Sequence, residues 1–271
     1  WTTSFGSSIP DVPLIQVDAS RTHIGKFYDA DVALVGDARL VAEQLSAALP
    51  ARTGDDKPFH TLQTSESIAG HDMGSDFAAA HTARTVDPRS LGIVLDELLP
   101  ENRNLVYDAG NFLGIVPYIS VPGPDHFKFT NNFASIGLGF GAALGFARAR
   151  RDAATVLLVG DGGFMMSVHA INTALQYDLP VVYVVLNDSA LGMVRGHQGD
   201  RLIASEFIET DHGAISRGMG GYGIKVQDSK DLPNALREAV SSGKPAVVDV
   251  VIDRGPNVDD LRASARRLTE T

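Results

Sequence analysis

Cysteine is absent from the 271 residues of this chain, and tryptophan occurs once. Without cysteine there is no disulfide, zinc–thiolate site, iron–sulfur cluster or cysteine nucleophile. Basic residues are scarce relative to acidic ones: 23 Lys and Arg against 33 Asp and Glu give a net charge of −10. A nucleic acid needs a basic surface, so we expect no nucleic-acid partner. A phosphate ligand would have to be held by backbone N–H groups or a metal ion.

Long hydrophobic runs are also lacking. No apolar stretch approaches the roughly 18–20 residues that a membrane span requires. The first residues carry neither the basic nor the apolar segment of a signal peptide. We therefore expect a cytoplasmic protein with no membrane association. Hydrophobic residues make up 44% of the chain and charged residues 21%, which is enough for a packed core.

Short apolar runs alternate with helical patterns along the chain. Strands are expected at 13–18, 31–36, 104–108, 155–160, 181–186 and 246–252. Helices are expected at 37–49, 88–98, 134–150, 167–177 and 232–241, and a further loosely held helix after residue 255. The last three strands are nearly continuously apolar, as in strands covered on both faces. This alternation predicts an α/β fold: a doubly wound parallel sheet with helices on both faces, preceded by the remnant of a second α/β domain.

The composition also divides the chain into segments. Residues 1–50 form the expected remnant domain. Residues 51–85 are rich in Ser, Thr, His and Gly with weak periodicity, so we expect an interdomain linker with at most a short helix. Residues 86–271 form the expected main domain.

A glycine-rich turn follows the strand 155–160. Three glycines surround Asp161 in the sequence Gly160-Asp161-Gly162-Gly163, and Phe164 comes next. Such a turn lets the backbone approach an anion, and the N–H groups of the following helix point at the same place. A carboxylate beside a phosphate requires a cation between them, and Mg²⁺ fits. The alternative is a tight strand–helix turn with Asp161 as a cap.

A second pair of polar residues follows the strand 181–186. Between Gly162 and the pair Asn187-Asp188 lie 24 residues, the length of one helix and one strand. One right-handed crossover brings this pair beside Asp161 at the carboxyl edge of the sheet, where ligands of doubly wound folds bind. The Ala190 carbonyl could complete a metal site. An ordinary Asn-Asp turn is the alternative.

Other patterns are weaker. The stretch 137–145 superficially resembles a dinucleotide fingerprint, but no apolar strand precedes it and no acidic ribose partner lies about twenty residues on. A dinucleotide-binding oxidoreductase is thus a disfavoured alternative. The eight histidines show no metal-ligand spacing, and no Gly-x-Ser-x-Gly elbow occurs. His197 could face a substrate, although a solvated helix is the simpler interpretation.

Together, Gly160-Asp161-Gly162 and Asn187-Asp188 resemble the cofactor motif of thiamine-diphosphate-dependent enzymes. The stretch 133–145 resembles the segment under the cofactor's thiazolium ring. The stretches 161–180 and 191–195 are similar to acetolactate-synthase-type members, and 15–37 resembles the end of that family's middle domain. The resemblance implies thiamine diphosphate and Mg²⁺ as cofactors and makes 86–271 the diphosphate-binding domain. FAD is left open.

The resemblance also assigns site residues. Metal ligands would be Asp161, Asp188 and the Ala190 carbonyl, with Asp188 standing where the family has Asn. Asn187 would be structural, or a ligand if the register shifts. Ile136 would support the bent cofactor. The implied cofactor-binding set is Gly110, Asn111, Phe112, Ala134, Ser135, Ile136, Gly160, Asp161, Gly162, Gly163, Phe164, Asp188, Leu191, Gly192 and Met193.

The implied activity is C–C bond formation or cleavage on a small 2-oxo acid or aldehyde, as a decarboxylase, lyase or carboligase. In the family a glutamate from a pyrimidine-binding domain activates the cofactor. We expect a partner chain to supply that domain in a homo- or hetero-oligomer, and this chain, as a fragment, processed chain or half of a split enzyme, to be inactive alone. The catalytic residues are unknown. A non-catalytic regulatory or binding subunit with the same fold is the alternative.

Overall fold

The computed structural model describes residues 9, 11–50, 61–130 and 132–254. The chain divides into two compact units, with the boundary between His71 and Asp72, inside the predicted linker 51–85. The expected helix after residue 255 lies outside the described residues. Within the described ranges, no helix has both the length and the apolar character needed to cross a membrane.

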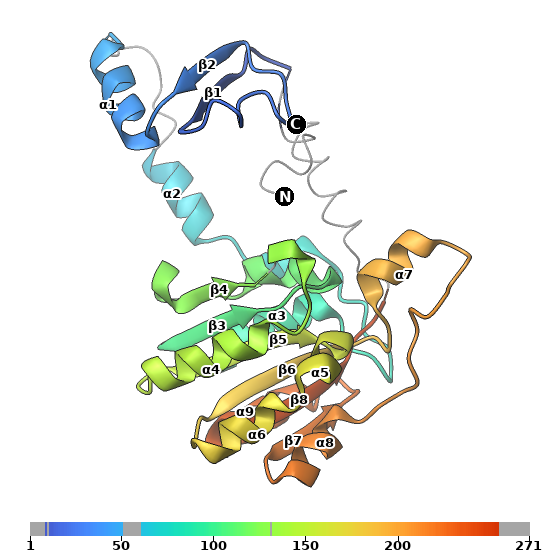
Figure 1. The fold of residues 1–271 in the computed structure, drawn as a ribbon. Helices are drawn as coiled ribbons and strands as arrows, with labels where there is room; N and C mark the ends of the chain where they lie inside the picture. Colours follow the sequence, from blue (N-terminus) through green and yellow to red (C-terminus); the bar gives the residue numbers. More distant parts are fainter. Residues whose placement is uncertain (1–8, 10, 51–60, 131, 255–271) are drawn as a thin grey trace. The chain divides into compact units, whose positions relative to one another are not determined.

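The described residues of the smaller unit form two parallel strands and two helices (Figure 1). Its elements are β1 (Ile15–Asp18), β2 (Val32–Val35), α1 (Ala38–Ala48) and α2 (Leu62–Ala69). Asp37 caps α1, because its side chain accepts hydrogen bonds from the N–H groups of Arg39 and Leu40. The predicted strands and helix of this region are therefore present, and α2 is a short helix within the predicted linker.

The larger unit is built on a six-stranded, fully parallel sheet with the order β4-β3-β5-β6-β8-β7 (Figure 1). The strands are β3 (Arg103–Tyr107), β4 (Phe127–Phe129), β5 (Ala154–Gly160), β6 (Val181–Asn187), β7 (Tyr222–Val226) and β8 (Ala246–Val251). The predicted doubly wound α/β fold is confirmed. The sequence patterns missed β4 and β7, which are short edge strands and are less completely buried than the central ones.

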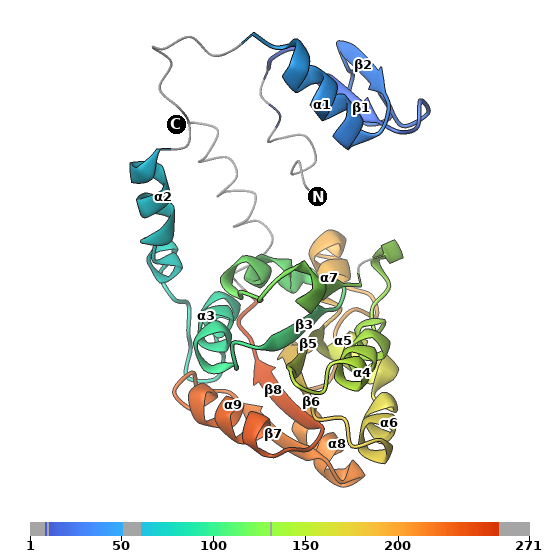
Figure 2. The ribbon, with the colours of Figure 1, turned by 90° about the vertical axis from the view of Figure 1, so that its left-hand side faces the viewer.

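Helices cover both faces of this sheet (Figure 2). One face packs against α3 (Pro88–Leu98), α9 (Leu232–Ser241) and the 3₁₀ segment Asn111–Tyr118. The other packs against α4 (Gly139–Ala149), α6 (Ala170–Gln176) and α8 (His212–Met219). Side chains alternate along β5: Val156 and Leu158 enter the first core, and Leu157 and Val159 enter the second. This explains the continuous apolar runs of the central strands.

Two predicted helices differ from the structure. The helix expected at 134–150 begins only at Gly139, because Phe133, Ala134 and Gly137 have φ angles of 60°, 50° and 85°. Such values interrupt a right-handed helix. The helix expected at 167–177 is present as the shorter α6. A separate helix, α5 (Asp161–Ser167), precedes it and starts directly at the end of β5.

Candidate functional site

Three neighbouring strands of the larger unit each end immediately before an aspartate. Asp108 follows β3, Asp161 follows β5 and Asp188 follows β6. Because these strands are parallel and adjacent, their carboxyl ends meet at one edge of the sheet (Figure 1). The three residues are 0%, 3% and 9% exposed. Buried carboxylates need charged or hydrogen-bonding partners, so this edge is the candidate site.

Asp161 connects the two loops that the sequence motif singles out. Its Oδ1 accepts a hydrogen bond from the Gly162 N–H at 2.8 Å, and its Oδ2 accepts one from the Ala190 N–H at 3.1 Å. Burial raises the pKa of Asp161 to about 7, and the negative charge of Asp188 adds to this rise. The crossover between β5 and β6 thus brings Asp161 together with the loop that carries Asp188 and Ala190.

Asp188 meets residues of two further segments. A Cβ atom placed on Gly192 would lie 2.7 Å from Asp188 Oδ2 and 2.3 Å from Asn111 Nδ2, so the three residues converge. Burial raises the pKa of Asp188, whereas the Arg254 charge and a hydrogen bond from the Asn111 side chain lower it. Asn111 and Gly192 were both predicted as cofactor-binding residues, and the structure brings them to Asp188.

The glycines of the first turn of α5 lie against other predicted site residues. A Cβ on Gly162 would come within 2.6 Å of Leu191, and one on Gly160 within 3.2 Å of the Phe112 ring. A Cβ on Gly163 would come within 2.6 Å of Asp108 Oδ2. Side chains are therefore excluded here, which leaves backbone N–H groups at the start of α5. Phe164 is fully buried beneath this turn.

Asp108 binds the backbone that directly follows Ala134, Ser135 and Ile136. Its carboxylate accepts hydrogen bonds from the N–H groups of Gly137 at 2.6 Å and Gly139 at 3.1 Å. Burial raises the pKa of Asp108, while these hydrogen bonds oppose the rise. Asp108 was not among the predicted site residues. Its position directly after a buried strand was the signal that could have identified it.

The Asn187 side chain makes its hydrogen bonds with groups other than the two carboxylates of the sequence motif. Its Nδ2 donates to Asp249 Oδ1 at 2.9 Å, and its Oδ1 accepts from the Ser189 N–H at 3.1 Å. Of the two roles predicted for Asn187, this geometry favours the structural one. Arg254, which sequence reasoning missed, donates from Nε to the Asp188 carbonyl at 2.8 Å. No local sequence pattern indicates this contact between residues 66 positions apart.

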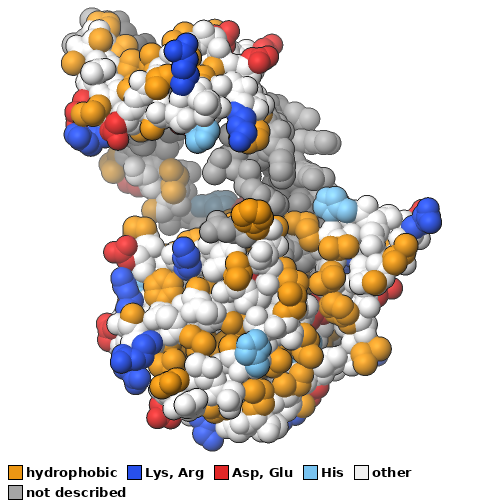
Figure 3. All heavy atoms as spheres, in the orientation of Figure 1, with side chains coloured by type: hydrophobic (Ala, Val, Ile, Leu, Met, Phe, Trp, Pro, Cys, Tyr) orange, Lys and Arg blue, Asp and Glu red, His pale blue; other side chains and the backbone are white. Residues whose placement is uncertain are grey.

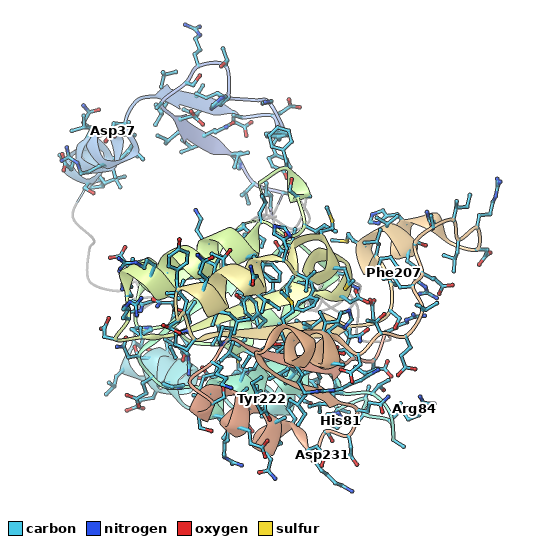
Figure 4. All side chains as sticks on the ribbon, turned by 60° about the horizontal axis from the view of Figure 1, so that its bottom comes forward. Asp37, His81, Arg84, Phe207, Tyr222 and Asp231 are labelled. Carbon is cyan, nitrogen blue, oxygen red and sulfur yellow. The ribbon has the colours of Figure 1, made fainter. Side chains whose placement is uncertain are left out.

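The loop after Asp188 leads into α7 (Gly192–Gln198). The Leu191 N–H donates to the Ser205 carbonyl at 2.8 Å, and Phe207 lies on the segment that follows α7 (Figure 4). His197 is exposed, and its Nδ1 lies 2.7 Å from the Met193 carbonyl of the same helix. His197 therefore turns back onto α7, consistent with a solvated helix.

Several large apolar side chains near the site are exposed to solvent in the described part of the chain. Figure 3 shows hydrophobic side chains on the face that carries α4, α5 and α6. The exposed large apolar residues near the site segments are Phe133, Leu138, Met165, Met166, Val194 and Phe207. An apolar rim around buried carboxylates is typical of a ligand site.

The donor set suits a hard divalent cation that is shared with a ligand. Asp161, Asp188 and the Ala190 carbonyl supply oxygen atoms, which Mg²⁺ prefers. Among the residues that the structure describes, no three His, Asp or Glu side chains form a complete metal site of their own. Mg²⁺ demands octahedral coordination, so the remaining positions would belong to ligand oxygens and water.

Comparisons with known proteins give several similarities. The family profile "Thiamine pyrophosphate enzyme, C-terminal TPP binding domain" matches residues 108–250. A Methanocaldococcus jannaschii protein described as a probable acetolactate synthase large subunit is 29% identical over 90% of this chain and 43% of its own length. The large subunit of Escherichia coli acetolactate synthase isozyme 3 is 26% identical over 95% of this chain and 46% of its own length.

Two further similarities extend the range of relatives. The Danio rerio 2-hydroxyacyl-CoA lyase 2 is 27% identical over 89% of this chain and 41% of its own length. The structure of a thiamine diphosphate-dependent 4-hydroxybenzoylformate decarboxylase from Rhodococcus jostii RHA1 matches 91% of this chain and 45% of its own, with a TM-score of 0.70 and 22% identity. The last similarity supports the fold alone. The chain thus spans less than half the length of these relatives.

Proposed function

Since this chain belongs to the thiamine pyrophosphate enzyme family and carries its C-terminal TPP-binding domain, we propose that the larger unit binds thiamine diphosphate through Mg²⁺ at the carboxyl ends of β3, β5 and β6. The observation that carries this proposal is the hydrogen bond between the Asp161 carboxylate and the Ala190 N–H at 3.1 Å. It brings the two halves of the sequence motif to one point, as a shared metal ion requires.

Each segment has a distinct task in this proposal. Asp161, Asp188 and the Ala190 carbonyl would hold Mg²⁺, and the N–H groups at the start of α5 would face the diphosphate. The loop at Gly110–Phe112 would close the other side, since Asn111 already contacts Asp188. Asp108 would hold the segment 134–136 against the rest of the cofactor through Gly137 and Gly139.

The bound cofactor supplies an electron sink for breaking or forming a C–C bond next to a carbonyl group. We propose a small 2-oxo acid or aldehyde as substrate, in a decarboxylase, lyase or carboligase reaction. The names of the acetolactate synthase and 2-hydroxyacyl-CoA lyase relatives support this range. The proposal includes a partner chain with the pyrimidine-binding domain and an oligomeric assembly. FAD binding and the cytoplasmic location stay predictions.

Calorimetric titration of the chain with thiamine diphosphate tests the proposed function. We expect binding at least about a hundredfold tighter with Mg²⁺ than with EDTA, because the metal ion neutralises the repulsion between the diphosphate and the two carboxylates. Thiamine monophosphate is the matched ligand control and should bind much more weakly. Equal binding with and without Mg²⁺ would contradict the proposal, and tight binding of NADH instead would favour the oxidoreductase alternative.

The glycine at the start of α7 provides a steric test. Gly192→Ala should weaken Mg²⁺-dependent thiamine diphosphate binding about tenfold or more, because the new methyl group would displace Asn111 and Asp188. Gly196→Ala is the matched control on the same helix, where an added Cβ meets nothing within 4 Å. The same calorimetric titration measures both. Parent-like affinity in the Gly192 variant would show that Asp188 and Asn111 lie outside the binding site.

A non-catalytic binding subunit with this fold is the second candidate, and the aspartate at position 188 is the feature that favours it. Both candidates predict cofactor binding. Turnover of pyruvate or another 2-oxo acid, measured after addition of a chain that carries the pyrimidine-binding domain, separates them. A complex that binds the cofactor but turns over no such substrate would favour the non-catalytic subunit.

A further inference from the structure

A buried polar cluster lies next to the candidate site, and the proposed chemistry makes no use of it. Asp249, on β8, is 0% exposed, and His212, at the start of α8, is 2% exposed. The Asp249 Oδ2 accepts the His212 backbone N–H at 2.9 Å and lies 3.1 Å from His212 Nδ1. Its Oδ1 accepts from Asn187 Nδ2 at 2.9 Å. The buried Asp249 carboxylate on β8 therefore connects this strand to the start of α8 and to the end of β6.

The first connection leads to the metal-binding loop. Asn187 Oδ1 accepts hydrogen bonds from the Ser189 N–H at 3.1 Å and the Ser189 Oγ at 3.3 Å. Ser189 has a φ of 53°, in the left-handed region that is unfavourable for a residue with a side chain. Such a conformation persists only where its surroundings hold it. Asn187 provides that restraint, and Asp249 orients Asn187.

The second connection leads to the first turn of α5. The His212 ring packs edge-on against the Phe164 ring, with centroids 5.2 Å apart and an interplanar angle of 79°. Phe164 is 0% exposed and lies three residues after Asp161 in the same helix. His212 therefore contacts the helix that carries one proposed metal ligand, while Asp249 holds the turn that carries the other.

We propose that Asp249 and His212 are positioning residues, which hold the Asn187–Ala190 turn and the start of α5 in the geometry at which Asp161 and Asp188 can share one cation. The metal-binding part of this inference rests on the proposed function. The restraint on the turn does not, so it can be tested without any ligand.

Hydrogen–deuterium exchange of the ligand-free chain tests the restraint directly. Asp249→Asn places an amide NH₂ against a hydrogen-bond donor, and His212→Phe keeps a ring against Phe164 but removes the Nδ1 contact. Both variants should increase amide exchange at Ser189 and Ala190 about tenfold or more. The two variants change the cluster from different elements, so His212→Phe tests the inference even if Asp249→Asn fails to fold.

The matched control is Thr155→Val, which removes a buried hydrogen bond between Asn104 Nδ2 and Thr155 Oγ1, 3.2 Å apart. These residues lie near the amino ends of β3 and β5, at the edge of the sheet away from the site. The control should leave exchange at 189–190 unchanged. Unchanged exchange in the folded cluster variants, or an equal increase in the control, would overturn the inference.

Titration with Mg²⁺ in the presence of thiamine diphosphate gives a second measurement. The cluster variants should bind Mg²⁺ about 10- to 100-fold more weakly than the parent, as is usual when groups that orient metal ligands are removed. Parent-like Mg²⁺ affinity in both variants would overturn the role in metal binding. If the parent chain itself binds neither ligand, the proposed function fails, and the exchange experiment still decides whether the cluster holds the turn.

Discussion

Asp161→Asn is expected to weaken Mg²⁺-dependent thiamine diphosphate binding by more than about a hundredfold. Groups that merely orient a metal ligand contribute about 10- to 100-fold, so loss of a charged ligand should exceed this range. The substitution also replaces one of the two oxygens that accept the Gly162 and Ala190 N–H groups with an amide NH₂. Calorimetry with both ligands measures the loss directly.

Two further variants make this test specific. Asp188→Asn restores the amide that the family resemblance leads one to expect and keeps an oxygen ligand, so Mg²⁺ affinity should change by at most about tenfold. Asp178→Asn is the surface control, because Asp178 is exposed, and it should bind like the parent. If Asp161→Asn retains the parent's affinity, Asp161 is not a metal ligand and the proposed site is wrong.

The Mg²⁺ affinity is also expected to fall about tenfold between pH 8 and pH 6. Burial and the charge of Asp188 raise the pKa of Asp161 to about 7, so at pH 6 the folded chain holds a proton that the metal ion must displace. At pH 8 Asp161 is already ionised in most of the folded chains. Calorimetry in buffers of different ionisation enthalpy measures both the affinity and the protons released.

The same pKa shift predicts the opposite pH dependence for the stability of the metal-free chain. Asp161 keeps its proton up to about pH 7 in the folded chain but loses it near its ordinary pKa of 3.8 when unfolded. Its contribution to stability is therefore present below that ordinary value and is lost as the pH rises through about 7. Thermal unfolding in EDTA from pH 4 to pH 8 should show this loss, and added Mg²⁺ should reverse it at pH 8.

Asp188→Asn is the control for the charge contribution to this behaviour. Without the Asp188 charge, the pKa of Asp161 should fall, and the pH midpoint of Mg²⁺ binding should move to lower pH. Mg²⁺ affinity that is equal at pH 6 and pH 8 in the parent would contradict the prediction. An unchanged midpoint in the variant would show that burial alone sets the pKa.

The ends of individual helices could be predicted from the sequence where a local signal marks them. The helices expected at 88–98 and 232–241 are α3 and α9: Asp87 caps α3, and Leu232, Ala235 and Leu236 lie on the buried side of α9. These signals are local, because a cap or an apolar stripe acts within one helix. The start of α4 was predicted too early, because the positive φ angles of Phe133 and Ala134 have no sequence signal comparable to a glycine.

The sequence by itself determined the class of the fold, because buried parallel strands require continuous apolar runs. It also predicted that the two halves of the motif lie at one edge of the sheet, because one crossover between neighbouring strands has a characteristic length. Only the tertiary structure decided the polar contacts around this motif. The hydrogen bond between Asn187 and Asp249 spans 62 positions, and the one between Arg254 and Asp188 spans 66. Such contacts depend on strand order and register, and no local pattern of residues encodes either of them.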